Sequence, residues 1–287
     1  MVQRGKSARA GADEILHSPK NSSGLRRFGA ALALGSATCA LALFAPSAAW
    51  ASCGSPNSTT CDVTEYEPYM PFSNGNDADG TVNIQNGGTL DLGVGAFFHN
   101  GNYNVDLSVF AAGTVNILSG GTFLNSGAFE NGYEYTGDVN ISGEFANFIG
   151  AVFNNGGNGH GTVTVQDGGL FYNTGLFQNG DLGEGYGTLI IQSGGEFWNT
   201  SSGTLNQGGA PNSISNSGTF TNEGALNGGT FTNEIGGVFN NLAGNSIGGS
   251  ENVNFINHGT FNIGYGETGI ATTTLNGNFT QSSTGSL

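Results

Sequence analysis

A phrase of the type Gly-Thr-Val recurs along the chain and constrains its fold more than any other feature. It begins at Gly80, Gly113, Gly137, Gly161 and Gly187. After a longer first interval, successive copies start about 24 residues apart, a period typical of one coil of a solenoid, in which each unit is covered by its neighbours. We therefore expect stacked repeats rather than a conventional globular core.

Each repeat contains three short runs that are separated by glycines. In the unit that begins at Gly113 they are residues 114–117, 122–125 and 128–131. Apolar and polar residues alternate in the first run, as in a strand with one buried face. Runs of four residues are too short for helices and too rich in β-branched side chains to favour them. The pattern predicts an all-β fold, a right-handed parallel β-helix (β-solenoid) with three short strands per coil of about 24 residues.

Stacking is needed because one such unit has no second layer to cover its apolar face. Coils stacked about 4.8 Å apart let every strand pair with its equivalent above and below. An antiparallel sandwich with many hairpins is the alternative. Asparagines recur at strand ends and are expected to form side-chain amide ladders between coils. They are Asn125, Asn131, Asn154, Asn173, Asn179 and Asn199.

The rhythm shortens after Gly208. The phrase Gly-Thr-Phe-Thr-Asn begins at Gly218 and again at Gly229, and a variant begins at Gly237. We interpret these copies as further coils with smaller turns. Residues 80–287 then have room for about eight or nine coils.

Composition supports an ordered chain. Glycine supplies 52 residues, but no three-residue period accompanies it and there are only 6 prolines, which excludes collagen. Hydrophobic residues make up 37% of the chain and include 20 phenylalanines. This apolar content argues against disorder, because burying it offsets the entropy lost on folding.

Charge is distributed very unevenly. All 6 basic residues lie in the first 27 positions, whereas 19 of the 21 acidic residues follow Ser52. The part of the chain after Ser52 is acidic and has no Lys or Arg, so it cannot neutralise phosphates. Nucleic acid and anionic lipid headgroups are therefore excluded as partners.

The N-terminal segment has the order of a secretory signal. Arg26 and Arg27 precede an apolar stretch over residues 28–45, followed by Pro46 and small residues that end at Ala51. We predict a signal peptide with an extended n-region over residues 1–51, cleaved between Ala51 and Ser52. An uncleaved membrane anchor is the alternative.

Two cysteines follow the predicted cleavage site. Cys53 and Cys61 enclose seven residues that include turn formers. In an exported chain such a pair favours a disulfide over metal or redox chemistry. We therefore predict an N-terminal cap over residues 52–79, stapled by a Cys53–Cys61 disulfide, and β-solenoid repeats over 80–287.

Catalytic motifs are weak. Residues 244–248 fit the letters of a nucleophile elbow but lack the expected strand and helix context. His99, His160 and His258 each stand alone among Gly and Asn and are expected to be structural or surface residues. We predict no catalytic, cofactor-binding or metal-binding residues and no cofactor.

Acidic residues leave two alternatives open. Residues 76–80 are dense in oxygen ligands, but a solvated turn fits them better than a calcium loop. Asp138, Glu144, Asp167 and Glu196 recur on successive repeats and suggest, as the alternative function, a β-helix polysaccharide-processing hydrolase. A lyase of this shape uses Arg or Lys, which the mature part lacks.

The repeats resemble the β-helical passenger domains of autotransporters, the type V secretion adhesins of Gram-negative bacteria. The resemblance rests on the signal with its long n-region, the GTVNI-x-x-GGTF coils, and the segment TTTLNGNFTQSSTGSL from Thr272. It covers the chain from about Gly80 onward. Autotransporters end in an outer-membrane barrel, whereas this sequence stops at Leu287. We therefore expect a truncated product or one that needs a separate translocator.

These patterns together predict a non-enzymatic, structural or adhesive rod at the cell surface or outside the cell. Without an exporter it would stay in the periplasm. Its expected partners are a host or matrix protein, a glycan, or another copy of itself. Neutral faces of Thr and Asn with aromatic groups suit such recognition.

Overall fold

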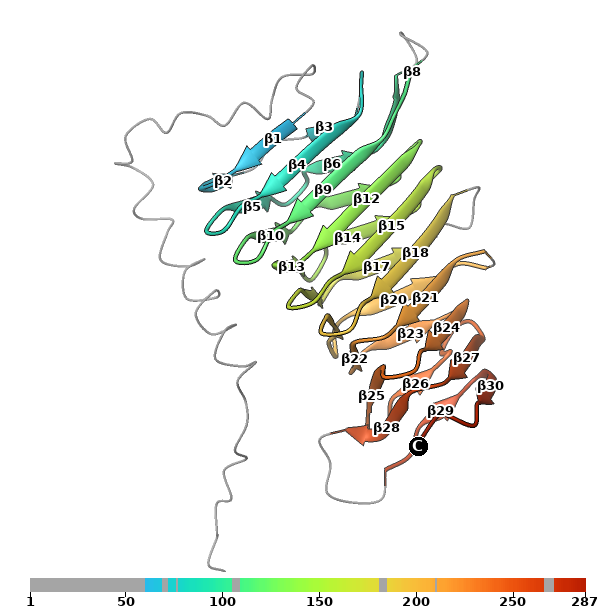
Figure 1. Cartoon of the computed structure of the whole chain (residues 1–287). Helices are drawn as coiled ribbons and strands as arrows, with labels where there is room; N and C mark the ends of the chain where they lie inside the picture. Colours follow the sequence, from blue (N-terminus) through green and yellow to red (C-terminus); the bar gives the residue numbers. More distant parts are fainter. Residues whose placement is uncertain are drawn as a thin grey trace, which may run out of the picture. The chain divides into compact units, whose positions relative to one another are not determined.

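The structure, a computed structural model, describes residues 60–68, 72–75, 77–104, 109–180, 185–209, 211–265 and 271–287. All regular elements in these ranges are β-strands, and three parallel sheets form the faces of a coil, seen in Figure 1. The strands of each sheet follow in their spatial order. Sheet A consists of β1 (Thr60–Val63), β4 (Gly80–Ile84), β9 (Gly113–Ile117), β12 (Thr136–Ile141), β15 (His160–Val165), β18 (Tyr186–Ile191), β21 (Ser213–Asn216), β24 (Thr230–Asn233), β27 (Val253–Asn257) and β30 (Gly277–Gln281). Sheet B consists of β2 (Tyr66–Pro68), β5 (Thr89–Leu92), β10 (Thr122–Asn125), β13 (Glu144–Asn147), β16 (Leu170–Asn173), β19 (Glu196–Asn199), β22 (Thr219–Asn222), β25 (Val238–Leu242) and β28 (Thr260–Tyr265). Sheet C consists of β3 (Phe72–Asn74), β6 (Phe97–Asn100), β11 (Ala128–Asn131), β14 (Val152–Asn155), β17 (Leu176–Asn179), β20 (Thr204–Gln207), β23 (Ala225–Asn227), β26 (Ser246–Ile247) and β29 (Thr274–Leu275).

Strands in every sheet pair with their equivalents one coil away, in parallel. Gly113 is in register with Gly137, Gly137 with Gly161, and Gly161 with Gly187, as the repeat alignment predicts. The β-solenoid with three strands per coil and the predicted coil length is therefore confirmed. The alternative of an antiparallel sandwich is wrong. Among the described strands only β7 (Asn102–Asn104) and β8 (Val109–Ala111) pair antiparallel.

The first described coil precedes Gly80. Strands β1, β2 and β3 pair in parallel with β4, β5 and β6, so residues of the predicted cap already take part in the sheets. Cys61 lies in β1 with its side chain buried. Cys53, Ala51 and Ser52 fall outside the described residues, so the disulfide, the cleavage site and the domain boundaries stay predictions.

Coil length varies while strand register is kept. The step from Gly80 to Gly113 is the longest in sheet A because the β7–β8 hairpin is inserted into this coil. The step from Ser213 to Thr230 is the shortest in that sheet. The following steps return to the usual length, since Thr230 pairs with Asn254 and Asn254 with Asn278.

The interpretation of the shortened rhythm was therefore only partly right. The two Gly-Thr-Phe-Thr-Asn phrases do not belong to successive coils on one face. Strand β22, which follows Gly218, lies in sheet B, whereas β24, which follows Gly229, lies in sheet A. The same strand sequence serves two faces because both need one inward Phe and one inward Asn.

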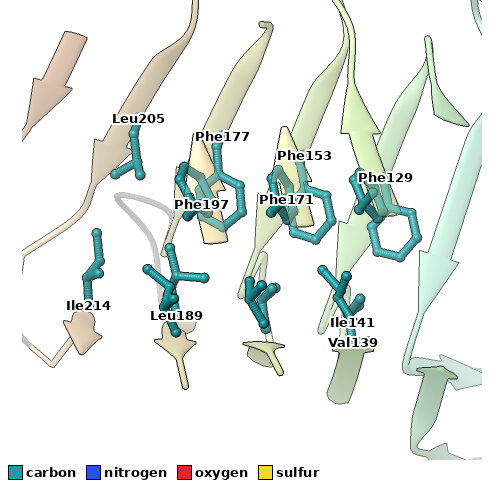
Figure 2. Packing of buried hydrophobic residues seen from close by; sticks show 14 of the residues in the cluster. Phe129, Val139, Ile141, Phe153, Phe171, Phe177, Leu189, Phe197, Leu205 and Ile214 are labelled. Carbon is teal, nitrogen blue, oxygen red and sulfur yellow. The ribbon is translucent and has the colours of Figure 1, made fainter. Parts of the chain in front are cut away.

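Columns of inward-facing apolar side chains run along the coil (Figure 2). Aliphatic residues form most of the column of sheet A, as at Val139 and Ile141, whereas phenylalanines form most of those of sheets B and C. Stacked rings within a column are separated by about one coil spacing, as in the 4.8 Å between the ring centres of Phe145 and Phe171. Rings of sheets B and C meet edge to face, for example Phe153 and Phe171 at 5.4 Å. This geometry suits aromatic quadrupoles and packs the interior densely.

Ladders of hydrogen-bonded asparagine side chains connect successive coils at the ends of the strands. In sheet C, Asn131 donates to Asn155 and Asn155 to Asn179, each at 2.8 Å. The second amide hydrogen of Asn155 is donated to the backbone oxygen of Thr188, which begins the next face. Two further ladders have the same form. They run through Asn125, Asn147, Asn173, Asn199, Asn222 and Asn241, and through Asn216, Asn233, Asn257 and Gln281.

The predicted ladders are confirmed with one correction. Asn154 is not a ladder residue, because its side chain points outward and is half-buried. The ladder position is its neighbour Asn155, which is fully buried. Strand alternation from the inward Phe153 explains the difference.

Glycines in the turns between strands contribute to the stability of the coil, and this contribution can be tested. Gly150 and Gly156 both have positive φ, +85° and +81°. A Cβ at Gly150 would meet nothing within 4 Å, whereas one at Gly156 would lie 2.1 Å from the backbone oxygen of Tyr186. We expect Gly150→Ala to cost roughly 1 kcal/mol for its backbone conformation alone, and Gly156→Ala at least about 3 kcal/mol. Urea unfolding of both variants checks this, and equal losses would contradict it.

Candidate functional site: the outer faces of the coil

Exposed aromatic side chains are concentrated where sheet C leads into sheet A. Phe110, Tyr135 and Tyr186 there are exposed by 40–59%, and Phe97, which begins β6 at the opposite end of sheet C, is exposed by 54%. Elsewhere among the described residues only Tyr66 and Phe279 are large exposed aromatics. We call this region the C–A edge. It comprises His99, Phe110, Glu130, Tyr133, Tyr135, His160 and Tyr186, and the ring of Phe97 lies beside it, 6.4 Å from that of His99.

Register explains why these residues meet. His99 and Glu130 occupy the same outward position on β6 and β11, so they are neighbours one coil apart. Their side chains are in contact, with Nε2 of His99 and Oε2 of Glu130 3.2 Å apart. The His99 ring also stacks on Tyr133, with ring centres 4.1 Å apart.

The second half of the C–A edge continues along sheet A. Phe110 of the hairpin lies against Tyr135, with ring centres 5.3 Å apart. His160 and Tyr186 are in register on β15 and β18, and their rings lie 4.8 Å apart. The turns of consecutive coils therefore build one aromatic surface.

The C–A edge carries negative charge from Glu130 and the neighbouring Glu134. Burial, followed by the charges of Glu134 and Glu130, raises the pKa of Tyr133 above its usual value. Tyr133 therefore keeps its hydroxyl proton well beyond neutral pH. The edge offers hydroxyl donors, aromatic faces and carboxylates, which suits a ligand that is neutral or basic.

A second group of aromatic residues lies on the outer face of sheet B. Tyr172 and Trp198 are in register on β16 and β19, and their rings meet edge to face at 5.4 Å. Glu223, which directly follows β22, lies beside them. Burial raises the pKa of its carboxyl, and the Trp198 indole N–H partly offsets this rise. We call Tyr172, Trp198 and Glu223 the sheet B cluster.

Sheet A presents a more polar surface. Its outward positions are mostly hydroxyl and amide side chains, which rise in register from coil to coil. One column contains Thr81, Thr114, Asp138, Thr162, Thr188, Ser213 and Thr230. This face carries little charge and few aromatic groups, so it gives less basis for specific recognition than the C–A edge.

The four acids considered for a hydrolase are not brought together. Glu144 and Glu196 share an outward column of sheet B, but Leu170 lies between them. Asp138 lies on sheet A, and Asp167 lies in an exposed turn after β15. Paired carboxylates on either side of a glycosidic bond are what such chemistry requires.

The described residues considered for a nucleophile elbow and for a calcium loop do not lie in a catalytic or metal-binding arrangement. Ser246 of the possible nucleophile elbow lies on the exposed side of the two-residue strand β26, and the chain then passes through Gly248 with positive φ. Asp79 accepts a hydrogen bond from the backbone N–H of Ala112, at the base of the hairpin. Within the described ranges, no three or more His, Cys, Asp or Glu side chains cluster closely enough to hold a metal ion. No helix in these ranges could span a membrane.

Two histidines have surroundings that the sequence prediction did not include. His99 and His160 stand alone along the chain but have aromatic or acidic neighbours in space. Aligning the repeats would have found them. His160 and Tyr186 each immediately precede the Gly of the repeated phrase, and His99 and Glu130 share the third position of equivalent strands.

Comparisons with known proteins add little to this picture. No protein-family model matches the chain, and no curated protein matches it. One similar solved structure is the crystal structure of a TibC-catalyzed hyper-glycosylated fragment of TibA. It is 16% identical, covers 80% of this chain and 90% of that one, and has a TM-score of 0.17. A likeness of this size assigns neither a family nor a function.

Proposed function

We propose that the chain is an exported, non-enzymatic surface rod of the autotransporter passenger type, which binds its ligand through the C–A edge. Its partners are a host or matrix protein, a glycan or another copy of the rod. Three observations support this proposal. The coil is a stiff, repetitive support, the candidate carboxylates are not paired, and exposed aromatics gather at one edge.

The exposure of the aromatic side chains is the strongest support for a binding function. Phe110 is 59% exposed, although the interior of the coil offers many buried positions for phenylalanine. Leaving large aromatic groups in water forgoes the stabilisation that burial would provide. Aromatic residues that gather at a surface are typical of binding interfaces.

Binding to host cells or extracellular matrix tests the proposal directly. We expect the variant Phe110→Ser/Tyr135→Ser/Tyr186→Ser to lose most binding, about tenfold or more, since aromatic anchors dominate interface energies. Its thermal stability should change little because these side chains lie outside the core. Fluorescence-detected binding and a melting curve give the two measurements.

A matched control removes exposed apolar side chains from other turns. Val94, Ile149 and Ile235 are exposed by 72–87%. The first two lie at turns from sheet B to sheet C, and the third lies at a turn from sheet A to sheet B. The variant Val94→Ser/Ile149→Ser/Ile235→Ser should bind normally. Equal loss in both variants would show that general hydrophobicity, and not the C–A edge, is responsible, and absence of binding by the unaltered chain would refute the adhesive function.

A further inference from the structure

The sheet B cluster lies on a different face from the C–A edge and has a different chemistry. Tyr172 and Trp198 point outward from adjacent strands, and both are half-buried by their surroundings. The indole nitrogen of Trp198 is shielded from solvent, and its N–H partly offsets the rise that burial causes in the pKa of the Glu223 carboxyl.

A carboxylate completes the cluster. Burial raises the pKa of the Glu223 carboxyl, and burial followed by the charge of Glu223 raises the pKa of Tyr172. The backbone places Glu223 one coil beyond Trp198, since the Glu223 N–H donates to the backbone oxygen of Asn199, the residue after Trp198, at 2.7 Å. No Lys or Arg occurs among the described residues, so the chain supplies no basic side chain there to balance this half-buried charge.

The missing component is a cation. A tryptophan ring is the best aromatic partner for a cation, and a carboxylate beside it adds a charge-assisted hydrogen bond. A guanidinium group satisfies both, because it is planar, permanently charged and only weakly hydrated. It would recover the solvation that Glu223 loses through burial.

Ring geometry argues against a sugar at this position. Tyr172 and Trp198 meet at an angle of 86° and so offer no common flat surface on which a pyranose ring could lie. The charge of the chain points the same way. Beyond Ser52 it carries 19 acidic residues and no Lys or Arg, which attracts basic partners over a distance.

We propose that the sheet B cluster binds an arginine side chain in a basic segment of a partner protein. Glu223 pairs with the guanidinium, and Trp198 and Tyr172 enclose it. This inference rests on the proposed adhesive function and identifies a basic segment as one chemical class of partner. The sheet B cluster is separate from the C–A edge. Its failure would therefore leave binding through the C–A edge intact.

Tryptophan fluorescence reports on this site alone. The chain has 2 tryptophans, Trp50 and Trp198, so the full chain with Trp50→Phe retains only the reporter in the cluster. We expect a tetra-arginine peptide to change the Trp198 emission saturably, with an affinity that falls as salt is added. The uncharged tetra-citrulline peptide should leave the emission unchanged.

Two charge-matched variants separate a specific site from general attraction. Glu223→Gln removes one charge from the cluster, and Glu196→Gln removes one charge from another outward column of the same sheet. We expect Glu223→Gln to weaken tetra-arginine binding by about tenfold or more and Glu196→Gln by less than about twofold. Melting curves should show that both variants fold, and Tyr172→Leu, which should also weaken binding, provides a variant that leaves every charge in place.

Several outcomes would overturn the proposal. Equal weakening by Glu223→Gln and Glu196→Gln would show non-specific attraction to an acidic protein. An equal response to tetra-citrulline would exclude recognition of charge. A saturable response to a neutral oligosaccharide such as cellohexaose, without a response to tetra-arginine, would identify a glycan site instead.

Discussion

Asn155→Ala is expected to lower the free energy of unfolding by at least about 3 kcal/mol. The side chain is fully buried, accepts a hydrogen bond from Asn131 and donates to both Asn179 and the backbone oxygen of Thr188. Its removal leaves three buried polar groups without partners, and each such group costs about 1–3 kcal/mol. Denaturant unfolding followed by circular dichroism measures the loss.

The preceding residue provides the control. Asn154 has the same side chain on the same strand but points outward and is half-buried. We expect Asn154→Ala to cost less than about 1 kcal/mol, as most surface substitutions do. Similar losses at the two positions would mean that the ladder contributes nothing beyond an ordinary hydrogen bond.

Phe171→Ala should be about as damaging, with an expected loss of roughly 3–5 kcal/mol. Its ring stacks on Phe145 and Phe197 and meets Phe153 and Phe177 edge to face. The deletion removes all four ring contacts and leaves a void that neighbouring coils cannot fill, because their spacing is fixed by the sheets.

Unfolding curves should also change in shape. A defect in the middle of a linear array uncouples the coils on either side, so the transition should broaden or split. Leu170→Ala is the control, since Leu170 is the adjacent outward-facing residue. A narrow transition together with equal losses at positions 170 and 171 would contradict the continuous aromatic column.

Most of the fold was predictable because the repeat is explicit in the residues. Gly113, Gly137, Gly161 and Gly187 fall in register as aligned, since identical strands bury most when stacked on themselves. Errors arose where local sequence is ambiguous. Two consecutive asparagines at the end of β14 concealed the inward one.

Reuse of one strand sequence caused a different error. The phrase that precedes β22 and β24 has the same residues on two faces, and only the pairing of whole strands distinguishes them. The conformational preferences of the residues in one strand cannot show to which sheet it belongs, because both sheets require the same inward residues. The shortened coil was therefore recognised, but its extent was not.

The candidate sites were much less predictable than the fold. The C–A edge combines strand residues with residues of the turns that follow sheet C, and the hairpin that carries Phe110 has no counterpart in the other described coils. The sheet B cluster depends on Glu223 reaching back to Trp198 on the previous coil. Repeat alignment gives the column of a residue, but it does not give the direction in which a side chain at the end of a strand turns.

The asparagine ladders have one further consequence, which concerns polarity. In all three, the amide nitrogen of the earlier coil donates to the amide oxygen of the later coil, as from Asn131 to Asn155. The second hydrogen, held by a backbone carbonyl, fixes this orientation, because a flipped amide would place two oxygens together. The amide dipoles within each ladder therefore add along the axis and polarise one another. The stack thus has a direction inside as well as along its backbone, and the outward amides of sheet A oppose it, because Asn140 donates to Asn116 and Asn116 to Asn83.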